Sequence, residues 1–114
     1  MNSIDFELVV LSVSEWDPID DNVDVEVKFS DGSRFTATFF TVENIRSLFA
    51  KNKSTGECSK GKYLWATEMI LVERLDRETM EDTIAGLIRD DEFEDAFTKV
   101  ADVARLASDS GTAD

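Results

Sequence analysis

The first half of the chain carries three apolar segments with the spacing of β-strands. The run from Leu8 to Leu11 lies within the segment 5–14, which predicts a first strand. Apolar residues occupy every second position in the segment 23–29, and the same alternation returns at 35–39. The residues Ser30-Asp31-Gly32 between these two segments have the composition of a turn. The pattern therefore predicts one strand followed by a β-hairpin.

The length of the hairpin loop decides which residues face each other. A two-residue loop, Asp31-Gly32, would set Phe35 opposite Lys28 and would put the two apolar rows on opposite faces. A three-residue loop, Ser30-Asp31-Gly32, instead pairs Val27 with Phe35. It also places the glycine where a positive φ is needed. We therefore predict the three-residue loop.

The second half of the chain has mainly helical spacing. Thr41, Asp76 and Asp91 stand at N-cap positions before three apolar segments, and the third has the form of a capping box. Between the first two helices we expect a loop over 51–62 and a strand over 63–72. The buried faces expected for the three helices are Val42, Ile45, Leu48 and Phe49; Met80, Ile84, Leu87 and Ile88; and Phe93, Phe97, Val100 and Ala104.

The expected order of elements is β-β-β-α-β-α-α, which indicates an α+β domain. We predict a four-stranded, mostly antiparallel sheet with the helices packed on one face. A chain of 114 residues has the length of a single domain, which we expect to span 1–107. The segment 108–114 is small and polar, and it is expected to form a disordered C-terminal tail.

Charge and composition narrow the class of function. The chain has 25 acidic and 12 basic residues, no histidine, and a formal net charge of −13. An acidic surface attracts basic partners and repels nucleic acid and anionic membranes. The missing imidazole removes the commonest general base and the commonest metal ligand. We therefore predict a protein-binding module that is not an enzyme, has no catalytic residue, and needs no cofactor or metal.

The sequence also predicts where the protein resides. Cys58 is the single cysteine, which excludes an internal disulfide and fits a reducing compartment. The start, Met1 to Asp5, lacks the basic and apolar regions of a signal peptide. The run from Leu8 to Leu11 is too short to span a bilayer. We expect a cytoplasmic protein, monomeric or homodimeric.

Two acidic segments are candidate surfaces for a basic protein partner. In the segment 15–22 a tryptophan stands among carboxylates, a composition found at interface hot spots. Asp20, Asn22 and Asp24 match the first three ligand positions of a calcium loop, but Val25 stands where such a loop requires glycine. The second segment, 90–95, has more carboxylates than the capping of a helix requires. The candidate partner-binding residues are Trp16, Asp17, Asp20, Asp21, Asp91, Glu94 and Asp95.

Two alternatives to this reading of the acidic surface remain open. The protein is acidic enough for its charge to serve solubility alone. It is also a candidate assembly protein that self-associates through a sheet edge, if the strand with Phe35, Phe39 and Phe40 lies at that edge. The basic residues are segregated as well, in a stretch that contains Glu57 as its only acid. These basic residues are Arg46, Lys51, Lys53, Lys60 and Lys62.

From Gly61 the chain reads Gly-Lys-Tyr-Leu-Trp-Ala-Thr-Glu-Met-Ile-Leu-Val, followed by an Asp76-capped helix that ends near Leu87-Ile88. In this stretch, about a quarter of the chain, it resembles small acidic bacterial proteins among which immunity proteins of toxin systems are found. The resemblance implies a small α+β protein that binds and blocks a cognate toxin, often a basic nuclease. It assigns no role to any single residue.

Overall fold

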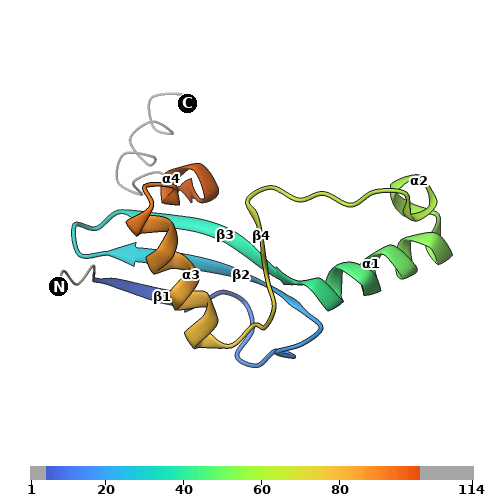
Figure 1. Ribbon diagram of the computed structural model, residues 1–114, viewed down its shortest axis with the longest axis horizontal. Coiled ribbons are helices and arrows are strands. Elements are labelled where there is room, and N and C mark those ends of the chain that lie inside the picture. Colours follow the sequence, from blue (N-terminus) through green and yellow to red (C-terminus); the bar gives the residue numbers. More distant parts are fainter. Residues whose placement is uncertain (1–4, 101–114) are drawn as a thin grey trace, which may run out of the picture.

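The computed structural model of the protein describes residues 5–100, which form a mixed α+β fold around one sheet (Figure 1). The elements are β1 (Phe6–Val10), β2 (Asn22–Phe29), β3 (Arg34–Thr41), α1 (Val42–Thr55), α2 (Glu57–Gly61), β4 (Met69–Val72), α3 (Arg77–Arg89), α4 (Phe93–Ala96) and β5 (Thr98–Lys99). The predicted α+β class with a mostly antiparallel sheet is confirmed, and the helices that pack on the sheet are α3 and α4.

The strand order places β3 inside the sheet. β1, β2 and β3 are antiparallel neighbours, and β4 runs parallel to the second half of β3. β5 pairs with the first half of β3 on the same side as β4, with Phe35 opposite Lys99. The hypothesis that the strand with Phe35 lies at a free edge is therefore wrong. One edge of the sheet is β1, where Arg77 of α3 donates to the Leu8 carbonyl at 2.9 Å, and the other edge is formed by β4 and β5.

The hairpin between β2 and β3 has the predicted register. Val27 lies opposite Phe35, and Val23 lies opposite Phe39. Gly32 has a φ of +91°, the left-handed conformation that a three-residue loop requires of its last residue. Because side chains alternate between the faces of a strand, this register puts all four apolar residues on the same face.

The core lies between this face of the sheet and two helices. Met80 and Ile84 of α3 are fully buried against it, and α3 crosses the strands in Figure 1. Near the hairpin end, Phe93 of α4 stacks on Phe97 with a centroid distance of 4.4 Å and meets Phe35 edge to face. Most of the core is therefore formed by the apolar residues of the sheet and of α3.

The region after β3 differs from the prediction. Thr41 caps α1 as expected, since its hydroxyl accepts from the Asn44 N–H at 3.0 Å. The predicted loop over 51–62 is partly helical, because α1 continues to Thr55; the short α2 that follows is a turn in which Cys58, Ser59 and Lys60 have positive φ. The predicted strand over 63–72 is formed only from Met69 onward. We call residues 42–68 the arm, because Figure 1 shows α1 and α2 extending away from the sheet.

The region after α3 also differs. Asp76 caps α3 as predicted, because its carboxylate accepts from the Thr79 N–H at 2.8 Å. Asp91 does not cap a third helix: its φ is +60°, and α4 is a single turn that follows Glu92. The chain then leaves the helix at Phe97 to form β5. Two further expectations, burial of Ala104 and a tail over 108–114, lie outside the described residues.

Candidate functional site

The first acidic segment, 15–22, is fastened to the rest of the fold by its tryptophan. Trp16 is half-buried against the core, and its indole N–H donates to the Leu75 carbonyl. The Leu75 N–H in turn donates to the Pro18 carbonyl at 2.8 Å. The main contacts of Trp16 are therefore within its own chain, and a contact with a partner stays a prediction.

The carboxylates of this segment also have partners within the chain. Asp20 accepts from the Asn44 amide at 3.1 Å and from the Ser47 hydroxyl at 2.8 Å, and both donors belong to α1. Asp17 accepts from the N–H of Ile19 at 2.9 Å. Asp21 accepts from the N–H groups of Asp17 and Asn22. These hydrogen bonds hold the segment in one conformation beside the start of α1.

The second acidic segment, 90–95, differs from the first in the hydrogen bonding of its candidate carboxylates. Asp91, Glu94 and Asp95 are all exposed. Within residues 5–100, none of their carboxylates forms a hydrogen bond or an ion pair. They are consequently able to pair with a cationic group without breaking an existing contact.

The fold does not bring the two acidic segments together. The segment 15–22 leads into Asn22 at the start of β2, whereas the segment 90–95 lies at the other end of the hairpin, near Phe35. The eight residues of β2 separate these ends by about 25 Å. The seven candidate residues therefore form two surfaces rather than one.

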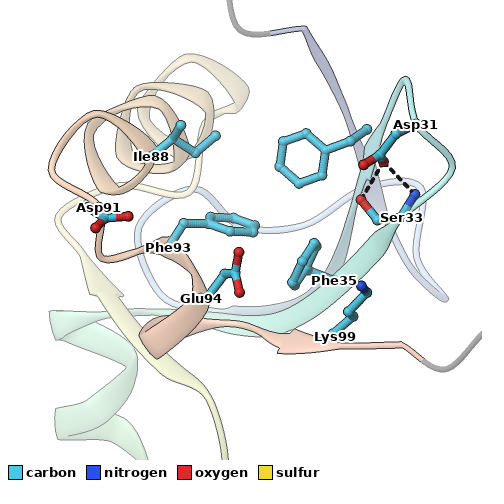
Figure 2. Close-up of a pocket in the computed structure, with 9 residues that line it drawn as sticks. Asp31, Ser33, Phe35, Ile88, Asp91, Phe93, Glu94 and Lys99 are labelled. Atoms are coloured by element: carbon cyan, nitrogen blue, oxygen red, sulfur yellow. Dashed lines mark hydrogen bonds between the residues drawn. The ribbon is translucent and has the colours of Figure 1, made fainter.

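A pocket lies beside the second acidic segment, between the hairpin turn, the end of α3 and α4 (Figure 2). Its volume is about 310 Å³. Figure 2 shows Asp31 and Ser33 on one side of the aromatic rings and Asp91 on the other. The lining residues are Phe29, Phe35, Ile88 and Phe93, with Asp31, Ser33, Asp91, Glu94 and Lys99 around them.

The charges around the pocket favour a cation. Three carboxylates, those of Asp31, Asp91 and Glu94, line the pocket together with one lysine, Lys99. The Ser33 hydroxyl and N–H donate to the Asp31 carboxylate at 2.6 and 2.8 Å, and these hydrogen bonds lower the pKa of Asp31 below its usual 3.8. Carboxylates beside aromatic rings form a suitable environment for an ammonium or guanidinium group.

Sequence reasoning found only part of this pocket. The sequence predicts Asp91 and Glu94 as partner-binding residues, but it predicts Asp31 only as a turn residue and Phe29 only as part of an apolar strand face. The chain position of Lys99, far from the hairpin, carries no local signal that it lies opposite Phe35. The pairing of β5 with β3 is what brings it there.

Comparison of the chain with protein-family models, curated proteins and solved structures finds no match. Within residues 5–100, no helix is long and apolar enough to cross a membrane. In the same part of the chain, no three cysteine, aspartate or glutamate side chains converge in a way that could hold a metal ion. The candidate site is thus the pocket together with the acidic segment beside it.

Proposed function

We propose that this protein is a protein-binding module without enzymatic activity and that it takes a basic partner at the acidic pocket. The observation that carries the proposal is the pocket itself, in which Asp31, Asp91 and Glu94 surround an aromatic floor. A lysine or arginine side chain of the partner fits this chemistry, because it offers an apolar stem for the rings and a charge for the carboxylates.

The net charge of −13 supports the same mechanism at longer range. A strongly acidic molecule attracts a basic one before contact, which raises the association rate about 10- to 1,000-fold at low salt. The carboxylates of the segment 15–22 add to this field while their hydrogen bonds keep them in place. Asp91, Glu94 and Asp95 then make the direct contacts.

The most specific form of this proposal is an immunity-like inhibitor that blocks a basic toxin or effector. It is supported by the resemblance over the stretch from Gly61 to Ile88 and by the acidic surface. In that form the bound partner loses activity, so inhibition accompanies binding.

The test is affinity capture of partners from the native host with the full chain, at low salt and with stepwise elution. Asp91→Asn/Glu94→Gln removes two carboxylates at the pocket, and asparagine tolerates the positive φ of Asp91. Glu78→Gln/Asp82→Asn is the matched control, since it removes the same two charges from exposed positions on α3. We expect a basic protein to bind the wild type and the control, to be released as salt rises, and to bind the pocket variant at least about tenfold more weakly.

Two results would contradict the proposal. One is a partner that stays bound at high salt, because steering between opposite charges is screened by ions. The other is equal loss of binding in the pocket variant and in the control, which would mean that overall charge matters and the pocket does not.

A further inference from the structure

The connection from α2 back to β4 exposes two aromatic side chains. Trp65 is 73% exposed, and Tyr63 is 49% exposed. Burial alternates along this connection, since Leu64 and Ala66 are half-buried between exposed neighbours. Such alternation is typical of an extended chain, in which residues two apart lie on the same side at a distance of about 7 Å. Tyr63 and Trp65 therefore present one aromatic surface.

The backbone of the same connection, residues 63–66, has no hydrogen-bond partner. Within residues 5–100, none of its N–H or C=O groups bonds to another group of the chain. Figure 1 shows these residues as an open connection between α2 and β4. An extended peptide can pair with such a segment because its own N–H and C=O groups alternate, whereas a phosphate backbone or a lipid surface offers no such alternation. The backbone of 63–66 therefore favours a peptide as its partner.

Three lysines meet at the turn where this connection begins. Gly61 of α2 is buried against α1: a Cβ atom at Gly61 would collide with the Lys53 side chain and would lie 2.9 Å from the Phe49 carbonyl oxygen. Lys60 and Lys62 are the chain neighbours of Gly61, so both lie beside Lys53. All three lysines are exposed, and within residues 5–100 none forms an ion pair. We call Lys53, Lys60, Lys62, Tyr63 and Trp65 the basic–aromatic patch.

The charge around this patch is opposite to that of the rest of the molecule. Five of the chain's 12 basic residues lie between positions 44 and 67, together with one of its 25 acidic residues. The 14 residues of α1 span about 21 Å, which separates the turn of α2 from the acidic segment 15–22 at the start of α1. The Debye length at physiological salt is about 8 Å. The lysines therefore determine the local field, which attracts an anionic partner.

We propose that the basic–aromatic patch binds a short acidic segment of a partner protein in extended conformation. The backbone of that segment pairs with residues 63–66, its carboxylates meet the three lysines, and its apolar side chains contact Tyr63 and Trp65. A single-stranded nucleic acid would use the lysines and the aromatic rings but would leave the backbone groups of 63–66 unpaired. The peptide is the occupant that satisfies all three features of the surface.

This surface is separate from the acidic pocket of the proposed function. The arm begins after Thr41 at one end of β3, while the pocket lies near Phe35 at the other end. The two surfaces also take partners of opposite charge. Failure to capture a basic partner would therefore leave the present proposal intact, and failure to bind an acidic peptide would leave the proposed function intact.

The test is selection of peptides by the full chain at physiological salt, from a displayed library of short peptides with glutamate at every second position and random residues between. We expect the enriched peptides to carry apolar residues at several random positions, because the patch is partly aromatic. Fluorescence anisotropy of a labelled, selected peptide then gives its dissociation constant. Lys60→Gln/Lys62→Gln and Trp65→Ala are each expected to raise this constant at least about tenfold without altering the circular dichroism spectrum.

The matched control is Arg74→Gln/Arg89→Gln, which removes two positive charges from exposed positions outside the arm and should bind the peptide like wild type. Amide hydrogen exchange, followed by NMR, tests the backbone contact. In the free protein the N–H groups of 63–66 are expected to exchange rapidly. Bound peptide is expected to protect those of alternate residues, since alternate N–H groups of an extended segment point the same way.

A library that yields no bound peptide would overturn the proposal, and so would binding that both patch variants retain. Peptide binding without protection of the amides of 63–66 would rule out pairing with an extended partner. Binding of oligothymidylate at the patch in place of the peptides would assign the surface to a single-stranded nucleic acid instead. Asp91→Asn/Glu94→Gln, at the pocket, should leave peptide binding unchanged, whereas a loss in this variant would place the peptide at the pocket.

Discussion

The side chain and backbone of Thr41 connect three parts of this fold. It is fully buried, and its hydroxyl accepts hydrogen bonds from the N–H groups of Asn44 at 3.0 Å and Asp21 at 3.3 Å. Its own N–H donates to the Asp21 carbonyl at 3.2 Å. Thr41 thus ends β3, begins α1 and attaches the acidic segment 15–22. Local pattern predicted the helix cap, but the link to Asp21 depends on a contact across 20 residues.

Replacement of Thr41 by valine, which has the same shape and no hydroxyl, is expected to lower the free energy of unfolding by about 1–2 kcal/mol. Two N–H groups lose their acceptor in this variant, the buried one of Asn44 and the partly buried one of Asp21. Urea denaturation followed by circular dichroism measures the change. Thr36→Val, on the same strand, is the control, because the Thr36 hydroxyl has no hydrogen-bond partner within residues 5–100. Equal stability of the two variants would show that the hydroxyl of Thr41 is unimportant.

At the scale of elements, the sequence predicted a structure correctly where a single short-range feature decides it. The glycine in the hairpin loop and the alternation on both sides of it determined the register of β2 and β3. The predicted third helix failed because Thr98 and Lys99 pair with β3 as β5, so the chain must leave the helix at Phe97 and become extended. Polar residues between 51 and 55 resembled a loop, although they continue α1.

The N-terminus of α3 makes a prediction about acid stability. The Thr79 side chain and N–H hydrogen-bond to the Asp76 carboxylate and lower the pKa of Asp76 below its usual value of 3.8. A lowered pKa in the folded state contributes stability above the unfolded pKa, and this contribution is lost as pH falls through the folded pKa. Below pH 3.8, wild type is therefore expected to lose stability more steeply than Asp76→Asn, whose amide caps the helix without titrating.

Thermal unfolding at a series of pH values measures this difference. Asp82→Asn is the control, because within residues 5–100 the carboxylate of Asp82, later in α3, accepts no hydrogen bond. The control should follow the wild-type acid profile. If the stability of wild type and of Asp76→Asn fell with pH in the same way, the pKa of Asp76 would be the same in the folded and unfolded states, which would contradict the prediction.

At the scale of the whole molecule, unbalanced charge is the dominant electrostatic feature. With a net charge of −13, the excess acidic side chains repel one another in the folded state. At physiological salt the Debye length is about 8 Å, so dissolved ions screen much of this repulsion. The ion pairs between described residues are at the surface or partly exposed, so each contributes little to stability. Screening of repulsion is therefore expected to outweigh the screening of ion pairs.

The melting temperature should accordingly rise when sodium chloride is increased from low to physiological concentration. Differential scanning calorimetry measures the shift at constant pH. Potassium chloride at equal ionic strength is the control, since screening depends on ionic strength and not on the choice of monovalent cation. A melting temperature that falls as salt rises would mean that the surface ion pairs outweigh the net repulsion.

Local order in the sequence determined the α+β class, the hairpin register and the caps at Thr41 and Asp76, because periodicity and capping act over a few residues. Only the tertiary structure decided that β4 and β5 share one side of β3, and that α1 extends into an arm. It also brought Asp31 to Asp91 across the hairpin end to line one pocket. Such contacts join residues far apart in the chain, where packing against the whole core selects the partner and no local pattern specifies it.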